Sequence, residues 1–423
     1  MSLSTASSSC SSASLATAPS TPPLAPPSPR GNKNNAEKVD LTPSDVKDER
    51  PLKRSRLDDN STAPSSSKVY TTTLPYNKGL HLAPMVRIGT LPVRLVALEH
   101  GASIVWGPEI VDKAIIGAER VVDASSGTIK YIKNNRQVWE THPIEKSRLI
   151  FQLGSSDPDL AVQAAKVVEQ DVGGIGLNCG CPKHFSIQAG MGAALLKEPR
   201  KLCSILHALV TNLSVPIDVK IRLFDEPQET FDLVEQLLDT GVSALTVHCR
   251  TKEMRSREPA MLDRLSDIVK IGQRKRIPVI ANGDCFSVQD KDNIRQLTGV
   301  DAIMIARGAE ANPSCFDERG YRDLVDDVIP RILKIAIKTN QPFGNIKYIL
   351  NSLDLTKSSV NRPRDARTKI KLGINQAKTY EQMMTVVGLD ADQVVQEVKQ
   401  CSLEHLVPRW NERRKDIATS DSM

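Results

Sequence analysis

Short apolar runs alternate along the chain with stretches of helical periodicity, from residue 79 to about residue 316. The runs are four to six residues long and rich in β-branched side chains, which is typical of buried strands. There are eight of them, at residues 80–83, 103–106, 149–153, 174–177, 217–222, 244–248, 278–281 and 302–306. The helical stretches between them lie at residues 91–99, 158–170, 193–213, 230–239, 260–271 and 288–297.

Strands that are apolar on both faces and joined by helices are typical of parallel sheets, because right-handed crossovers return every strand in the same direction. Eight strands of this kind predict an α/β fold, a (β/α)8 TIM barrel. We expect the barrel at residues 76–316. A doubly wound open sheet is the alternative.

Three segments fall outside this alternation. Residues 119–145 hold two β-rich runs around a Ser-Ser-Gly turn and predict a hairpin inserted after the second strand. Residues 1–68 are rich in Ser, Ala, Pro and Lys and are predicted to be a disordered tail. Residues 317–423 are predicted to form a helical domain, with helical periodicity at 323–338 and 376–387. Its basic residues, which a solvated surface would also explain, are Lys347, Lys357, Arg362, Arg364, Arg367, Lys369 and Lys371.

Charge and cysteine usage narrow the class of protein. The net charge is +6, which favours an anionic partner such as nucleic acid. No run of eighteen apolar residues occurs, so no membrane span is expected. The eight cysteines are scattered, which favours free thiols in a reducing compartment. Cys179 and Cys181 have no second Cys or His pair at zinc-ligand spacing, so we expect no metal site.

Polar or conformationally special residues follow the eight apolar runs. The carboxyl ends of barrel strands meet at one mouth, so these residues are expected to form one site. They are Pro84 and Met85, Glu109, Gln152, Asn178 and Cys181, Lys220 and Arg222, His248 and Arg250, Asn282 to Asp284, and Ala306 to Gly308.

Several of these residues suggest a bound anion. Glycines 283 and 308 follow the last two runs, where backbone amides of barrels often hold a phosphate, although they also suit tight turns. Lys220 leaves an apolar run, and a buried ammonium needs an anionic partner, such as a flavin that gains negative charge on reduction. His248 is either a donor to the phosphate or a core histidine, and Gln152 suits the edge of a planar heterocycle.

Six ordered motifs follow the predicted strands. They are Leu82-Ala83-Pro84-Met85, Asn178-Cys179-Gly180-Cys181-Pro182, Val219-Lys220-Ile221-Arg222, Val247-His248-Cys249-Arg250, Ala281-Asn282-Gly283-Asp284 and Ala306-Arg307-Gly308. Together they resemble those of the tRNA-dihydrouridine synthases, which are FMN-dependent barrels. A segment from Met85 to Pro92 and another from Gly190 to Leu195 are similar to the eukaryotic subgroup that acts at position 20 of the tRNA D-loop.

The resemblance implies a role for each matching position. Cys181 is the expected proton donor, and Cys179 fills a variable position. Cys249 stands where the family often has Gly, which would crowd that loop. FMN is expected at Pro84, Met85, Val86, Gln152, Lys220, His248, Asn282, Gly283, Asp284, Ala306 and Arg307. The tRNA substrate is expected at Asn178, Lys183, Arg250, Arg362, Arg364, Arg367 and Lys369.

The expected reaction follows from the electronics of uracil. Hydride from flavin N5, renewed by NADPH or NADH, goes to C6, and the enolate character left at C5 needs an acid. A thiol with an ordinary pKa of about 8.5 is protonated at neutral pH and serves as that acid. The alternatives are an FMN oxidoreductase acting on free pyrimidines, like dihydroorotate or dihydropyrimidine dehydrogenases, and a non-catalytic tRNA-binding barrel.

Compartment and assembly are weakly encoded. The segment Pro51-Leu52-Lys53-Arg54-Ser55-Arg56 resembles a nuclear-import or nucleic-acid patch, although a random basic cluster is at least as good an explanation. The first thirty residues have Arg30 as their single cation, which makes a poor mitochondrial presequence. We expect a cytoplasmic or nuclear monomer, with a mitochondrial location less supported.

Overall fold

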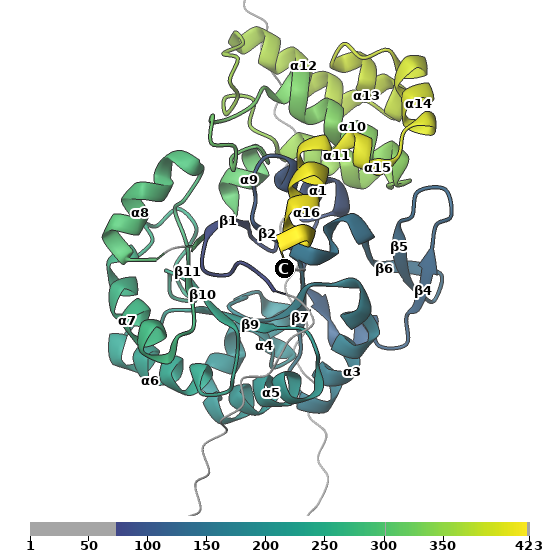
Figure 1. Ribbon diagram of the computed structural model, residues 1–423. Helices are drawn as coiled ribbons and strands as arrows, with labels where there is room; N and C mark the ends of the chain where they lie inside the picture. Colours follow the sequence, from purple (N-terminus) through teal and green to yellow (C-terminus); the bar gives the residue numbers. More distant parts are fainter. Residues whose placement is uncertain (1–72, 301, 421–423) are drawn as a thin grey trace, which may run out of the picture. The chain divides into compact units, whose positions relative to one another are not determined.

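The structure, a computed structural model, describes residues 73–300 and 302–420. Its centre is a barrel of eight parallel strands, in which pairing of β2 with β7 closes the ring (Figure 1). The strands are β1 (Gly79–Leu82), β2 (Ile104–Trp106), β7 (Leu149–Gly154), β8 (Gly174–Cys179), β9 (Ile217–Arg222), β10 (Ala244–His248), β11 (Val279–Asn282) and β12 (Ala302–Ile305).

Each of the eight predicted runs overlaps one of these strands, so the barrel prediction is confirmed and the open sheet is excluded. Strand residues such as Val219 and Ile221 are fully buried against the outer helices, while Asp218 and Lys220, which alternate with them along β9, face the barrel interior. The apolar character on both faces is what made these strands readable from the sequence.

Helices surround the strands on the outside (Figure 1). Prolines at the first turn start several of them, because the missing N–H is unpaired there in any case. The predicted helix at 193–213 is split by Pro199 into a 3-10 helix, η3 (Gly192–Lys197), and an α-helix. The helices are α1 (Leu91–Glu99), α3 (Pro158–Val168), α5 (Pro199–Asn212), α6 (Pro227–Leu238), α7 (Leu265–Lys275) and α8 (Lys291–Thr298).

The insertion after the second strand has one strand more than predicted. It begins with β3 (Ile110–Val111) and α2 (Asp112–Ile115) and continues as an antiparallel sheet of β4 (Glu119–Val122), β5 (Ile129–Lys133) and β6 (Arg136–Thr141). The second turn is Asn134-Asn135, and both residues have positive φ. That is the requirement of a two-residue hairpin turn, which asparagine meets without glycine.

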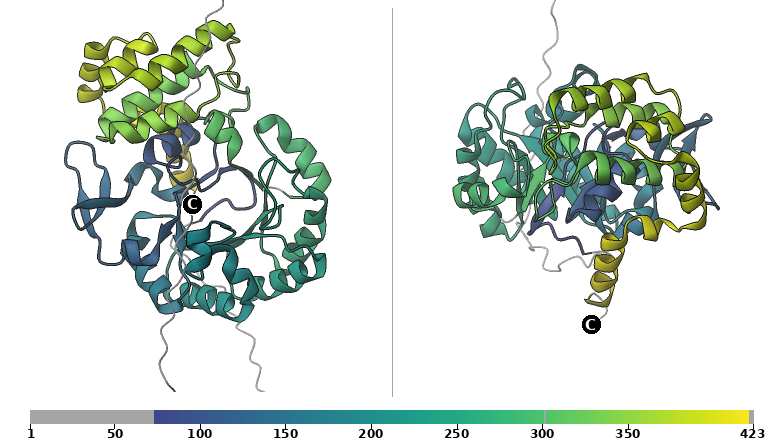
Figure 2. Two further views of the ribbon diagram at one scale, coloured as in Figure 1. Left: turned by 180° about the vertical axis from the view of Figure 1, so that it is seen from behind. Right: turned by 90° about the horizontal axis from the view of Figure 1, so that it is seen from above.

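Beyond β12 the described chain is helical. Figure 2 shows α12 to α14 lying together from two further sides, and successive helices of this group are in contact. A π-helical turn, Leu324–Val328, precedes α10. The helices are α9 (Arg307–Ala311), α10 (Ile329–Lys338), α11 (Phe343–Ser352), α12 (Arg364–Gln376), α13 (Tyr380–Val386), α14 (Ala391–Gln400), α15 (Leu403–Leu406) and α16 (Pro408–Ser420).

Buried polar contacts join the C-terminal region to the segment inserted between β2 and β7. Trp410 is 1% exposed, and its indole N–H donates to the carbonyl of Ile144 at 2.9 Å. Gln341 donates to the Glu140 carboxylate at 2.9 Å. The described residues belong to one compact unit, and the division at 316/317 remains a proposal. The predicted tail, residues 1–68, lies outside the described residues. Within the described part of the chain, no helix is both long and apolar enough to span a membrane.

Candidate active site

Neighbouring strands bring predicted site residues together at the carboxyl end of the barrel. Asn178 on β8 lies in register with Lys220 on β9. His248 on β10 lies in register with Arg222 of β9 and with Asn282 of β11. Four of the eight strands therefore deliver their polar residues to one continuous arc of the mouth.

Lys220 and Gln152 are polar groups without partners in the barrel interior. Burial of the Lys220 ammonium, reinforced by the charge of Arg222, lowers its pKa to about 7. The Gln152 side chain on β7 is 4% exposed. Among residues 73–300 and 302–420, neither side chain has a hydrogen-bond partner. Groups in this state are costly unless a ligand satisfies them.

His248 is held as a neutral imidazole. Burial lowers its pKa far below the usual value, and the charges of Lys220, Arg222 and Arg250 lower it further. The Arg250 guanidinium lies 3.3 Å from Nε2 of His248. Because arginine only donates, Nε2 is the acceptor, and the proton of the neutral ring is on Nδ1. Nδ1–H is therefore a donor available to an anion.

A charged cluster lies beyond β11 and β12. The Asp284 carboxylate accepts hydrogen bonds from both Arg250 and Arg307, and it accepts from the backbone N–H of Ala260 at 2.6 Å. The last contact holds the backbone of Ala260 beside the cluster. The helix predicted to begin at residue 260 begins with a 3-10 turn, η4 (Leu262–Arg264), and continues as α7 from Leu265. An anionic side chain cannot itself hold a phosphate, so the carboxylate orients the two guanidinium groups.

Two glycines let the loops of this cluster approach closely. Gly283 has φ of 134°, which favours glycine. A Cβ at Gly308 would lie 1.8 Å from the carbonyl oxygen of Phe286, so no other residue fits between the two loops. The Asn282 amide donates to the carbonyl of Met304 at 2.9 Å and ties β11 to β12. Ala306 follows β12 and is partly buried beside them.

The two neighbouring thiols differ sharply. Cys179 ends β8 and is fully buried, and burial together with the charge of Glu109 raises its pKa well above the usual value. Cys181 lies in the following loop and is partly exposed. Cys249, which directly follows β10, is 1% exposed and packs in the core, so the expected crowding of that loop is accommodated. Of the three, Cys181 is the thiol that a substrate can reach.

The loop of Cys181 is fixed by contacts that the sequence did not reveal. Arg222 donates from Nε to the carbonyl of Gly180 at 2.8 Å and from Nη1 to the carbonyl of Thr251 at 2.8 Å. On the other side, the N–H of Ala193 donates to the carbonyl of Cys181 at 3.0 Å. Arg222 was predicted only as a polar residue of the mouth, and the structure makes it a support for the thiol-bearing loop.

The loop after β1 carries Pro84, Met85 and Val86. The carbonyl of Met85 accepts from the N–H of Gly89 at 2.8 Å, and Val86 is 51% exposed. Arg87 has φ of 70°, and its guanidinium lies 3.6 Å from the ring centre of Tyr348 on α11. The loop is thus turned tightly and touches the C-terminal helices.

A buried ion pair between Arg94 and Glu145 holds the end of the loop that follows β1. Arg94 on α1 is 1% exposed and bonds to both oxygens of Glu145, at 2.9 and 2.6 Å. It also donates to the carbonyl of Gly89 at 2.7 Å and to that of Glu140 at 3.0 Å. An arginine within the apolar run Leu91–Leu98 was the available signal, and it was missed.

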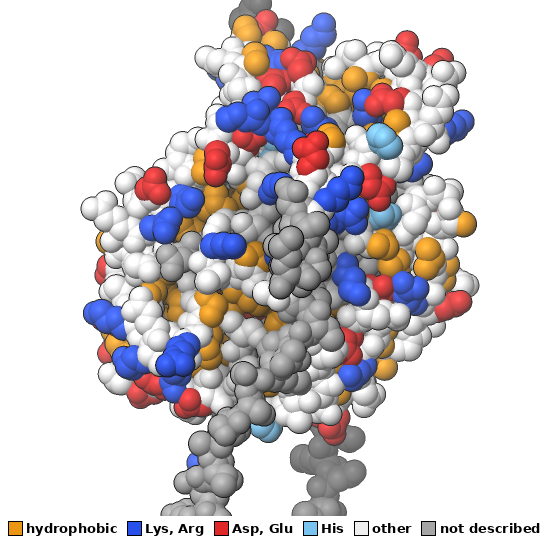
Figure 3. All heavy atoms as spheres, viewed as in Figure 1, with side chains coloured by type: hydrophobic (Ala, Val, Ile, Leu, Met, Phe, Trp, Pro, Cys, Tyr) orange, Lys and Arg blue, Asp and Glu red, His pale blue; other side chains and the backbone are white. Residues whose placement is uncertain are grey.

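The basic residues predicted to bind tRNA differ in their exposure and in whether they form ion pairs. Arg362 forms ion pairs with Asp323 and Asp326. Arg364 and Lys369 on α12 are exposed, and Arg367 is partly exposed. Figure 3 shows Lys and Arg side chains mixed with Asp and Glu over the C-terminal helices. Arg250, also predicted for substrate, lies in the Asp284 cluster, and Lys183 is exposed next to the Cys181 loop.

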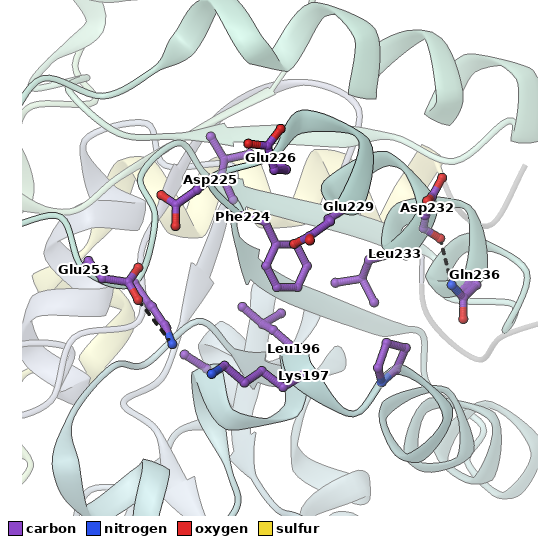
Figure 4. Close-up of a pocket in the computed structure, with 14 residues that line it drawn as sticks. Leu196, Lys197, Phe224, Asp225, Glu226, Glu229, Asp232, Leu233, Gln236 and Glu253 are labelled. Carbon is purple, nitrogen blue, oxygen red and sulfur yellow. Dashed lines mark hydrogen bonds and ion pairs between the residues drawn. The ribbon is translucent and has the colours of Figure 1, made fainter.

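A separate cavity of about 680 Å³ has a different lining from the mouth (Figure 4). It is bounded by η3, by the segment after β9 and by Lys252 and Glu253 after β10. Its carboxylates, from Asp225, Glu226, Glu229, Asp232 and Glu253, make it unsuited to a phosphate. None of the predicted site residues lines it.

Comparison with known proteins identifies the family. Residues 81–406 match the profile of the family described as dihydrouridine synthase (Dus). A tRNA-dihydrouridine(20) synthase of Schizosaccharomyces pombe is 47% identical over 319 residues, which are 73% of this chain and 65% of the relative. The chain thus spans slightly less than two thirds of that relative.

Two proteins of Saccharomyces cerevisiae extend the comparison. A tRNA-dihydrouridine(20) synthase is 42% identical over 67% of this chain and 79% of its own length. A tRNA-dihydrouridine(20a/20b) synthase is 32% identical over 70% of this chain and 79% of its own length. With its predicted motifs gathered at one barrel mouth and this similarity along most of its length, the chain belongs to the dihydrouridine synthase family.

Proposed function

We propose that the protein is a tRNA-dihydrouridine synthase that reduces the C5–C6 double bond of a D-loop uridine, at position 20, with FMN and NADPH or NADH. The observation that carries the proposal is the partly exposed Cys181 on a loop fixed beside Lys220. A proton donor and an unsatisfied cation at one mouth are what this reduction requires. The greater identity to the two position-20 enzymes supports the choice of uridine.

The residues of the mouth fit FMN. Arg250 and Arg307, the N–H on Nδ1 of His248 and the open backbone at Gly283 suit its phosphate. The unpartnered Lys220 and Gln152 suit the edge of its ring, and Pro84, Met85 and Val86 would also contact it. Bound FMN, reduced by NAD(P)H, supplies the hydride for C6 of uracil.

The chain's own residues complete the reaction. Cys181 gives its proton to C5, where negative charge develops as C6 is reduced. Arg222 and Ala193 hold the loop so that the sulfur stays at the mouth. Asn178 and Lys183 orient the uracil.

The target base must leave its stack to enter the mouth, at a cost of about a few kcal/mol. Contacts to the tRNA backbone offset that cost, and we assign them to Arg364, Arg367 and Lys369 on α12. Arg362, two residues before α12, is paired with Asp323 and Asp326, so we expect a smaller contribution from it. A cytoplasmic or nuclear site of action remains part of this proposal.

The test is made on the purified protein. We expect a flavin spectrum, oxidation of NADPH, and dihydrouridine at position 20 of a tRNA transcript, located by sequencing. Cys181→Ala should abolish dihydrouridine formation and leave flavin content and NADPH oxidation unchanged. Cys401→Ala, a matched change at another partly exposed thiol, should behave like the wild type.

Two outcomes would replace the proposal. Turnover of free uracil or dihydroorotate without action on tRNA would establish a small-molecule oxidoreductase. Binding of tRNA without flavin and without any reduction would establish a non-catalytic barrel. Loss of flavin in Cys181→Ala would show that this thiol is structural.

A further inference from the structure

Glu109 is a carboxyl group at the mouth for which the mechanism has no use. It lies between β2 and β3, three residues after Trp106. Its Oε1 is buried and has no hydrogen-bond partner in the described part of the chain. A Cβ built on Gly154 would lie 2.7 Å from this oxygen, so the carboxyl rests directly on the residue that ends β7.

The groups around Glu109 are those assigned to the uracil. Asn178 and Lys183 are both close enough to act on it and lower its pKa, although burial, the larger effect, raises it. Its charge also contributes to the raised pKa of Cys179. The carboxyl therefore lies between the end of β7 and the start of the Cys181 loop.

Asn178 is oriented in a way that leaves donors for a ligand. Its Oδ1 accepts from the N–H of Gly180 at 3.0 Å. The amide nitrogen carries two hydrogens, enough to serve both Glu109 and a ligand. A carboxylate acceptor and an amide donor thus stand side by side at the mouth.

We propose that the Glu109 carboxylate accepts a hydrogen bond from N3–H of the target uracil, while Asn178 donates to the neighbouring carbonyl. The inference rests on the proposed function and names the residue that selects its base. Uracil presents a donor at N3, whereas cytosine presents a lone pair there, which a carboxylate repels. The pair formed by Glu109 and Asn178 is complementary to the donor and acceptor edge of uracil and not to that of cytosine.

The flavin ring also has an N–H between two carbonyls, so the same chemistry has two sources. The position of Glu109 favours the substrate. Gln152, the residue suited to the flavin edge, lies two positions earlier on β7 than Gly154, and Glu109 is on the side of Asn178 and Lys183. The experiment below separates the two sources.

The experiment compares tRNA transcripts with uridine or 3-methyluridine at the target position. The wild type should strongly prefer uridine, because the methyl group removes the donor and meets the carboxylate. In Glu109→Ala, kcat/KM for uridine should fall on the order of 10- to 100-fold, the loss of a hydrogen bond to a charged group. The ratio of the two substrates should fall by a similar factor, because the variant neither holds N3–H nor excludes the methyl group.

Glu109→Gln is a near-isosteric second variant that keeps a neutral acceptor, and its substrate ratio should lie between those of the wild type and Glu109→Ala. Glu119→Gln, an exposed glutamate ten positions later, is the matched control and should keep the wild-type ratio. Flavin absorbance and the rate of flavin reduction by NADPH should be the same in all four proteins.

Three outcomes would overturn the inference. An unchanged ratio in both Glu109 variants would show that Glu109 does not contact N3. Loss of flavin in Glu109→Gln would assign the carboxyl to the cofactor. A wild type that leaves tRNA uridine unreduced would remove the proposed function itself, and the inference with it.

Discussion

Two charged side chains on β9, Asp218 and Lys220, lie two residues apart and face the same barrel interior. Within the described part of the chain, the protein provides hydrogen-bond partners for the first and none for the second. Asp218, toward the base, accepts from the Tyr76 hydroxyl at 3.2 Å and from the Trp106 indole at 3.3 Å. Burial raises its pKa to about 7, although these bonds oppose the rise. Lys220, toward the mouth, has a pKa lowered to about 7 and no partner among the described residues.

This difference distinguishes buried polar groups that stabilise the fold from buried polar groups that bind a ligand. At the base the chain supplies partners for the charged group, Asp218. Nearby His81 is kept neutral by burial, with a pKa of about 4, and contacts the carbonyl of Lys78 at 3.1 Å, while its buried Nδ1 has no partner among the described residues. At the mouth the chain leaves charges unsatisfied, as expected where a ligand completes the site. A charged residue in an apolar strand therefore indicates binding only where the fold provides no partner for it.

The largest effect is expected from Lys220→Met. Loss of one partner of a buried ionic contact costs about 3–5 kcal/mol, so the dissociation constant of FMN should rise on the order of 100- to 1000-fold. The unfolding free energy of the protein without FMN should stay the same or increase, because a desolvated charge is replaced by an apolar side chain. Flavin fluorescence titration and urea unfolding measure the two quantities.

Lys252→Met is the control for that change, since Lys252 is a surface lysine paired with Glu253. It should alter neither quantity. A Lys220→Met protein that binds FMN normally would place Lys220 with Asp218 as a structural residue and remove the contrast between mouth and base.

The second effect concerns pH. The pKa of Asp218 is about 7 in the folded protein against 3.8 for a free carboxyl, so between these values the folded state holds a proton that the unfolded chain has released. Stability from this group therefore falls as pH rises from about 4 to 7. In Asp218→Asn, the unfolding free energy relative to the wild type should rise by about 2–4 kcal/mol between pH 4 and pH 8.

Urea unfolding at several pH values tests this expectation, with FMN content recorded in each sample. Asp232→Asn, at an exposed carboxylate, is the control and should follow the wild type. Parallel profiles for Asp218→Asn and the wild type would contradict the structural role of Asp218.

The same comparison shows which features could be predicted from the sequence. The eight strands were readable because Val219, Ile221 and their counterparts are apolar on the helix side, and Lys220 stood out against them. The partners of Asp218 lie 142 and 112 positions away, and no local pattern links them to it. Contacts of this kind form only when the barrel closes. For the same reason, the sequence could not show that Lys220 lacks such a partner within the described residues.

The third effect concerns the loop that carries the thiol. Arg222→Met removes two hydrogen bonds from a charged donor, to Gly180 and Thr251. The rate of dihydrouridine formation should fall on the order of 10-fold, because the loop of Cys181 is less well held. Flavin reduction by NADPH should not change, and Arg222→Lys, which reaches one carbonyl, should recover part of the rate. Equal loss in both half-reactions would show that Arg222 acts on the flavin and not on the loop.

The smallest effect should separate two arginines of the helical region that differ as Asp218 and Lys220 do. Arg362 is held by Asp323 and Asp326, whereas Arg364 on α12 is exposed and forms no ion pair within residues 73–300 and 302–420. A single phosphate contact changes the slope of log affinity against log salt by about 1. Arg364→Ala should therefore weaken tRNA binding by about two- to fivefold at moderate salt and reduce that slope, measured by filter binding across a salt series.

Arg362→Ala should change the slope less and lower thermal stability more, because its guanidinium is already engaged by two carboxylates. An equal loss of slope in both variants would mean that tRNA competes with Asp323 and Asp326 for Arg362, and that an internal partner does not exclude a role in binding.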